Sequence, residues 1–116
     1  MADNLFELLD LHVAAFNHGV ETGEWEPMLD GLTPDAELVF VGVPAGPFAG
    51  RYAIAAAYRA NPPDDEVTII EAAAVGGEVV ASYGWRRAEG AKAGLMILTP
   101  GHGKLRRLVV TFDPAP

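Results

Sequence analysis

The apolar residues of this chain change their spacing once, and that change limits the possible folds more than any other feature. Before the run Asn61-Pro62-Pro63, apolar residues recur every three or four positions, which is typical of amphipathic helices. After it they alternate with polar residues or form short apolar runs, which is typical of strands. The sequence therefore predicts the α+β class, with helices packed on one face of a mostly antiparallel sheet.

Three helices are predicted in the first half of the chain. The first covers residues 4–22 and stops at a glycine. The second covers residues 24–32 and tolerates Pro27, because a proline in the first helical turn removes no hydrogen bond within the helix. The third covers residues 51–60 and ends where prolines follow.

Five strands are predicted. One covers residues 37–41, between a turn at Thr33-Pro34-Asp35 and a loop at residues 43–50 that is rich in proline and glycine. Gly76-Gly77 predicts a tight hairpin turn between two of the later strands. The four later strands are residues 67–75, 78–87, 93–99 and 105–113.

Composition limits the partners of this protein. With 116 residues, half of them hydrophobic, one domain covering residues 1–116 is expected. The absence of cysteine excludes disulfides and thiolate metal sites, and a net charge of -8 disfavours nucleic acid. The most apolar stretch, residues 38–49, is far shorter than the ~20 residues that a membrane-spanning helix needs. We therefore expect a cytoplasmic protein with no membrane partner and no nucleic-acid partner.

Three short motifs occur in an order known from one superfamily: Gly23-Glu24-Trp25-Glu26, Thr33-Pro34-Asp35-Ala36 and Phe48-Ala49-Gly50-Arg51. In these motifs, and in the strands that follow, the chain resembles the nuclear transport factor 2-like superfamily, which includes ketosteroid isomerases and SnoaL-like polyketide cyclases. The resemblance implies a cone-shaped, curved sheet whose concave face is covered by the three helices. It also implies an apolar cavity and a homodimer.

The resemblance further implies which positions would carry isomerase chemistry, and other residues occupy them. The family tyrosine of the first helix corresponds to Phe16, the proton-transferring aspartate to Phe40 or Val41, and the oxyanion-holding aspartate to Leu95. None of these side chains can transfer a proton or stabilise an oxyanion. A further family tyrosine is matched by Tyr58. We therefore expect the fold without ketosteroid isomerase activity.

Two residues are candidates for chemistry. Tyr58 is one, and His12 is the other, because it lies one helical turn before Phe16 on the same apolar face. The alternative for His12 is a core histidine bonded to a backbone carbonyl. His18 and His102 are widely separated from it, so no metal site and no cofactor are expected.

The predicted pocket takes side chains from both halves of the chain. Trp85 could face it or form a dimer contact. The predicted lining is Phe16, Phe40, Tyr58, Trp85, Leu95, Leu108 and Phe112. Two functions fit such a pocket: an enzyme that isomerises, cyclises or hydrolyses a small steroid-like or polyketide-like molecule, and a binding module that sequesters one. Apolar residues on both faces of the strand at residues 105–113 predict a homodimer through the outer sheet face.

Overall fold

The computed structural model describes residues 5–113, so residue 4 of the first predicted helix lies outside it. Helix α1 spans Leu5–Thr22 and helix α3 spans Arg51–Ala60, in agreement with two of the predicted helices. Helix α2 is shorter than predicted, Glu26–Asp30. It ends at Gly31 because the chain turns into the sheet directly afterwards.

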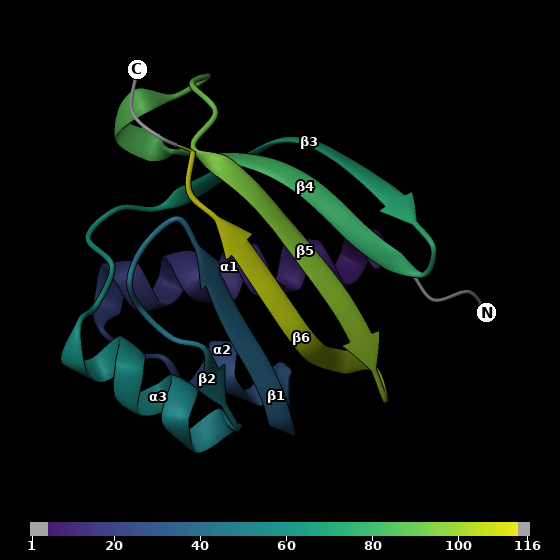
Figure 1. The fold of residues 1–116 in the computed structure, drawn as a ribbon. Helices are drawn as coiled ribbons and strands as arrows, with labels where there is room; N and C mark the ends of the chain where they lie inside the picture. The colour runs from purple at the N-terminus through teal and green to yellow at the C-terminus, as the bar shows by residue number, and fades with distance from the viewer. Residues whose placement is uncertain (1–4, 114–116) are drawn as a thin grey trace.

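Within the described residues, six strands form one curved, open sheet in the order β2-β1-β6-β5-β4-β3 (Figure 1). The pairing of β1 with β6 is parallel, and the other four pairings are antiparallel. The strands are β1 Leu32–Val41, β2 Phe48–Ala49, β3 Val67–Val75, β4 Glu78–Trp85, β5 Gly94–Gly101 and β6 Lys104–Thr111. The α+β prediction with a mostly antiparallel sheet is thus confirmed.

Strand β1 begins five residues earlier than predicted, at Leu32. The predicted turn at residues 33–35 is instead an irregular part of this strand, since the register with β6 shifts between Leu32 and Glu37. Pro34 lies in this interval and has no N–H to donate to a ladder. A proline therefore interrupts the pairing here without ending the strand.

Further differences concern a short additional strand and the end of β4. The loop predicted at residues 43–50 contains β2, which pairs with β1 through Phe48 opposite Leu38. Strand β4 stops at Trp85, and a short 3-10 helix, η1, follows at Arg86–Ala88. The Gly76-Gly77 hairpin is as predicted, with positive φ angles of 57° and 83° that glycine adopts without strain.

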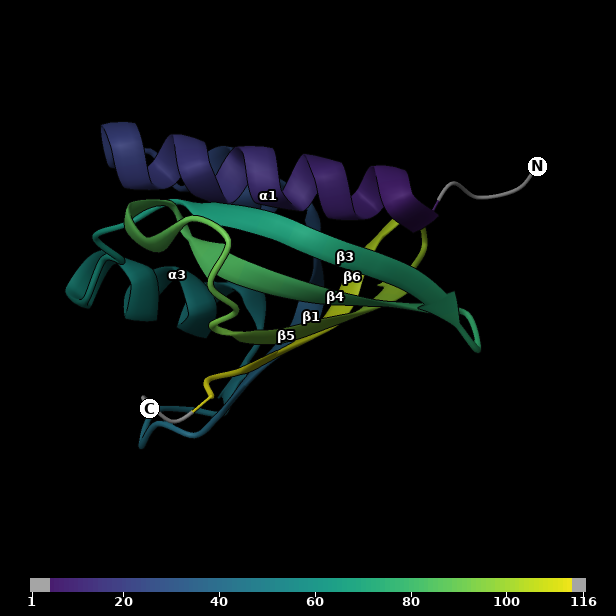
Figure 2. The same ribbon diagram turned by 90° about the horizontal axis from the view of Figure 1, so that it is seen from above.

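The helices lie on the concave side of the sheet (Figure 2). Helix α1 packs against β3, β4 and β5, whereas α3 packs against β1 and β2 near the other edge. Within the described residues, no helix is both long and apolar enough to cross a membrane.

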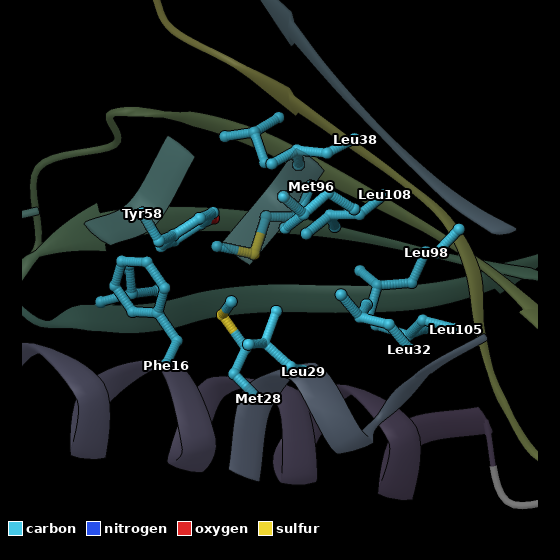
Figure 3. Packing of buried hydrophobic residues seen from close by; sticks show 14 of the residues in the cluster. Phe16, Met28, Leu29, Leu32, Leu38, Tyr58, Met96, Leu98, Leu105 and Leu108 are labelled. Atoms are coloured by element: carbon cyan, nitrogen blue, oxygen red, sulfur yellow. The ribbon is translucent and has the colours of Figure 1, made fainter. Parts of the chain in front are cut away.

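The core fills the space between α1, α2 and the sheet (Figure 3). At one end Trp25 contacts Phe16 and Tyr58, with ring centroids 5.9 Å and 5.0 Å away. The other end of the core consists of aliphatic side chains such as Leu98 and Leu105. The aromatic end borders the site described next.

Candidate functional site

A cavity of about 610 Å³ lies between α1, α3 and the concave face of the sheet. Its volume is within the range of small-molecule sites. Ala45, Ala56 and Ala60 border it and are exposed, so the cavity opens to solvent between α3 and the loop before β2. No Asp, Glu, Lys or Arg of the described residues lines it.

Six of the seven predicted pocket residues lie on the cavity wall: Phe16, Phe40, Tyr58, Trp85, Leu108 and Phe112. Of the two positions considered for Trp85, a cavity wall or a dimer contact, the structure has it on the cavity wall. It lies beside Tyr83, with ring centroids 5.6 Å apart. Phe40 lines the wall, while Val41 is 50% exposed outside it.

The prediction for Leu95 is wrong. This residue pairs with Ser82 and points to the outer face of the sheet, where it borders a shallow depression. Met96 is the β5 residue on the wall, in register with Ala81 on one side and Val110 on the other. Because residues 95–98 are all apolar, alternation could not reveal which of them points inward.

Four small residues of α3 were not predicted to belong to the site. They follow the 3- and 4-residue spacing of one helix face, and a large side chain at any of them would occupy the cavity. They are Ala53, Ala56, Ala57 and Ala60. The spacing was visible in the sequence, but small residues in a helix also fit close packing against a neighbour, and only the fold separates the two cases.

His12 and Tyr58 are the chemically distinctive members of the wall. Both are buried, both line the cavity, and within the described residues neither has a hydrogen-bond partner. The bond from His12 to a backbone carbonyl that we considered is therefore not formed. Tyr83 differs from Tyr58, because its hydroxyl donates to the carbonyl of Thr111 at 2.8 Å.

Burial shifts the titration of these groups. Desolvation lowers the pKa of His12 to about 4, which keeps the imidazole neutral near pH 7. Desolvation also raises the pKa of Tyr58 well above its ordinary range, so its hydroxyl keeps its proton and can donate it in a hydrogen bond. The buried part of the wall thus offers one permanent hydroxyl donor and one neutral ring with a donor and an acceptor nitrogen, while Asn61 also lines the cavity at an exposed position.

Two ion pairs lie close in sequence to the cavity wall. Asp65 accepts from Arg87 at 2.8 Å, and Glu66 accepts from Arg86 at 2.6 Å. These pairs join the segment after α3 to η1, next to Trp85 of the wall.

Among residues 5–113, no group of three or more His, Asp and Glu side chains is arranged to hold a metal ion.

The buried imidazole makes stability depend on pH. In the unfolded chain a histidine has a pKa near 6.5, whereas in the fold that of His12 is about 4. The unfolded state therefore binds the proton first, and the free energy of unfolding falls as the pH drops from 6.5 to 4. The difference of about 2.5 pKa units corresponds to about 3 kcal/mol over the whole range.

We expect the variant His12→Leu to lose this dependence, so that by pH 5 it gains about 2 kcal/mol relative to the natural protein, beyond any difference at pH 7.5. Urea unfolding at pH 7.5, 6 and 5 measures it. His18→Leu, at an exposed position of the same helix, is the matched control. If the free energy of unfolding fell by the same amount with pH in the natural protein and in His12→Leu, His12 would not be the cause of the pH dependence.

The fold defines the structural class of this protein, and solved structures share that fold. An NTF2-like protein of unknown function from Cytophaga hutchinsonii has a TM-score of 0.74 at 16% identity, over 98% of this chain and 94% of that one. A cystatin fold protein from Novosphingobium aromaticivorans has a TM-score of 0.67 at 18% identity, over 94% and 98%. A candidate ketosteroid isomerase from Kribbella flavida has a TM-score of 0.67 at 16% identity, over 92% and 81%. At these identities the similarity shows the NTF2-like fold alone.

A sequence comparison assigns the chain to one family among those that share this fold. The profile of the SnoaL-like domain matches residues 13–111, and the chain belongs to this family. The resemblance drawn from the three motifs is thereby confirmed at the level of the superfamily. A search of curated proteins finds no match.

Proposed function

We propose that this protein binds one small, flat, largely apolar molecule in the cavity, with Tyr58 and His12 supplying its polar contacts. The observation that carries this proposal is an apolar cavity of about 610 Å³ bordered by two buried polar side chains that have no hydrogen-bond partner among the described residues. Burial of apolar ligand surface contributes roughly 25 cal/mol per Å² before the costs of association. Unpaired polar groups in such a wall are stabilised when a ligand supplies their missing hydrogen bonds.

Aromatic rings support a polycyclic ligand of the steroid or aromatic polyketide kind. Flat rings stack on or meet the edges of other rings favourably, at centroid separations of about 4.5–7 Å. Ring pairs at such separations already lie along the wall, including Phe40 with Phe112 at 5.8 Å. The rings that line the cavity are those of Phe16, Phe40, Phe48, Tyr58, Tyr83, Trp85 and Phe112.

Sequestration of the ligand is favoured over chemistry on it. General acid–base catalysis works best when the pKa of the catalytic group lies near the working pH. The pKa of His12 is lowered to about 4, and no carboxylate of the described residues lines the cavity. An isomerase, cyclase or hydrolase on the same ligand is the alternative, and it would depend on Tyr58 and His12 alone.

Titration of the tryptophan fluorescence, to which Trp85 of the cavity wall contributes, with steroids and aromatic polyketides tests the binding function. We expect saturable binding with a dissociation constant in the micromolar range for at least one compound. Tyr58→Phe is expected to weaken the binding of that compound by about 3- to 10-fold, which corresponds to the net contribution of one neutral hydrogen bond. The same variant should be as stable as the natural protein, because the deleted hydroxyl has no hydrogen-bond partner in the part of the chain that the structure describes.

Tyr52→Phe is the matched control for this experiment, because Tyr52 is 91% exposed on the same helix. It deletes the same atom and should leave the dissociation constant unchanged. Failure of every compound to bind below millimolar concentration, or equal affinities for Tyr58→Phe and the natural protein, would contradict the proposal.

We further propose a homodimer through the outer face of the sheet. Cross-strand pairing places four apolar side chains in one row on this face: Val80, Ile97, Val109 and Val39. All four are buried or half-buried in the single chain. A sheet face that is fully solvated is usually more polar than this row, which favours a second copy as its cover.

Sedimentation velocity at high micromolar concentration tests the dimer. We expect the natural protein to sediment as a dimer and Ile97→Glu to sediment as a monomer, because a carboxylate at the centre of the row would be buried without a partner. Leu11→Glu is the control, since Leu11 is 61% exposed on α1, away from the sheet. A monomeric natural protein would refute the proposal.

A further inference from the structure

The inner end of the cavity holds together two buried polar side chains that have no hydrogen-bond partner among the described residues. His12 comes from α1 and Tyr58 from α3, yet both border the main cavity and also a small void behind it. The void is otherwise mostly apolar, with Met28, Leu38 and Ile54 among its walls. Figure 3 shows Tyr58 beside Phe16 of α1, and their ring centroids are 6.3 Å apart.

We propose that this inner end binds the carboxyl group of a small apolar carboxylic acid, and that one proton enters the cavity with it. The inference rests on the proposed ligand-binding function and names the class of its ligand. A carboxylic acid has a carbonyl oxygen that accepts from the Tyr58 hydroxyl and an O–H that donates to the acceptor nitrogen of His12. A ketone or ether has no donor, so it would leave that nitrogen unpaired.

The cavity wall favours a carboxylic acid over an amine. A protonated amine would be buried with no carboxylate beside it, since no Asp or Glu of the described residues lines the cavity, so an amine would have to release its proton to enter. A carboxylate is neutralised instead by the uptake of a proton, either on its own oxygen or on the imidazole of His12. In water near pH 7 the ligand is RCOO⁻, and in the cavity it is either RCOOH beside neutral imidazole or RCOO⁻ beside imidazolium. Both forms have the same net charge and both consume one proton from solution.

Other titratable groups near His12 do not replace it in this role. Glu37 of β1 borders the small void, but it is held in an ion pair with Arg107 at 3.0 Å. His18 of α1 and Asp30 of α2 border a separate groove on the outer side of His12 and are exposed. Tyr58 of α3 keeps its proton. Within the described residues, His12 is the base that borders the cavity.

The experiment compares three probes of one shape: 2-naphthoic acid, 2-naphthamide and 2-methylnaphthalene. Calorimetric titration in two buffers of different ionisation enthalpy, at pH 8, 7 and 6, counts the protons taken up. For the acid we expect uptake of one proton and an affinity that rises about tenfold for each unit of falling pH. For the two neutral probes we expect no uptake and no dependence on pH over this range.

The variant His12→Leu separates the role of the imidazole from mere exclusion of charge by an apolar cavity. It should weaken the binding of 2-naphthoic acid at least tenfold more than the binding of 2-methylnaphthalene. His18→Leu is the matched control and should leave all three affinities unchanged. If His12→Leu fails to fold, Tyr58→Phe applies the same comparison to the other polar group, with a smaller loss of about 3- to 10-fold for the acid.

The outcomes distinguish this inference from the function on which it rests. Binding of 2-methylnaphthalene with no binding of the acid, or with acid binding that takes up no proton, overturns the inference and leaves the cavity as a ligand site. Equal losses for acid and hydrocarbon in His12→Leu also overturn it. Absence of binding by all three probes overturns the proposed function itself.

Discussion

Trp25→Ala is expected to lower the free energy of unfolding by about 3–5 kcal/mol, the usual loss for a large aromatic side chain in a core. Trp25 is 2% exposed and contacts both Phe16 and Tyr58. Gly19 of α1 lies directly against its indole, because a Cβ atom at that position would overlap the ring. Removal of the indole thus leaves a void between helices that cannot approach one another freely.

Chemical denaturation at pH 7.5 measures this loss. The control is Tyr52→Ala, which removes an aromatic ring that is 91% exposed and should change stability by less than about 0.5 kcal/mol. A loss below 1 kcal/mol for Trp25→Ala would mean that the contact of α1 and α2 with α3 does not depend on this ring.

Ala57→Phe is expected to weaken ligand binding by about 10- to 100-fold without unfolding the protein. Ala57 lines the cavity on α3, so a phenyl ring at this position has the cavity as its nearest apolar space. A ligand must then expel that ring into water, which costs about 1.5–3 kcal/mol for a phenylalanine side chain. The helix itself loses only about 0.5 kcal/mol when phenylalanine replaces alanine.

The titration used for the natural protein measures the effect, alongside thermal unfolding. Ala14→Phe makes the same replacement at an exposed position of α1 and should bind ligand as the natural protein does. Undiminished binding by Ala57→Phe, in a folded protein, would place the ligand outside this cavity.

The elements that the sequence predicted well are those with local causes. The C-terminal end of α3 depends on a proline run, and the hairpin between β3 and β4 depends on two adjacent glycines, so neighbouring residues are sufficient to place both. The start of β1 was missed because Pro34 favours a turn locally, while pairing of Leu32 with Leu105, far along the chain, holds the strand in place. At this position the pairing with a distant strand outweighs the local preference of proline for a turn.

The site was predictable to the extent that alternation or helical spacing selects one face. This was sufficient for residues such as Phe16 and Phe112, which lie on the cavity wall. It failed for Leu95, in a strand that is apolar on both faces, where only the register with β4 decides the direction. It also could not show that His12 lacks a partner, because that depends on which backbone carbonyls the fold places beside it.

The central position of β6 has a consequence for the synthesis of the protein. This strand lies between β1 and β5 in the sheet, although both are made before it. Its contacts with β1 join residues 70 positions apart, such as Glu37 and Arg107. On the ribosome, the meander of β3, β4 and β5 can pair as it emerges, but β1 has only the two-residue strand β2 as a partner until β6 has left the exit tunnel. The unpaired, apolar edges of β1 and β5 are therefore where a nascent chain of this protein is most exposed to aggregation and most in need of a chaperone.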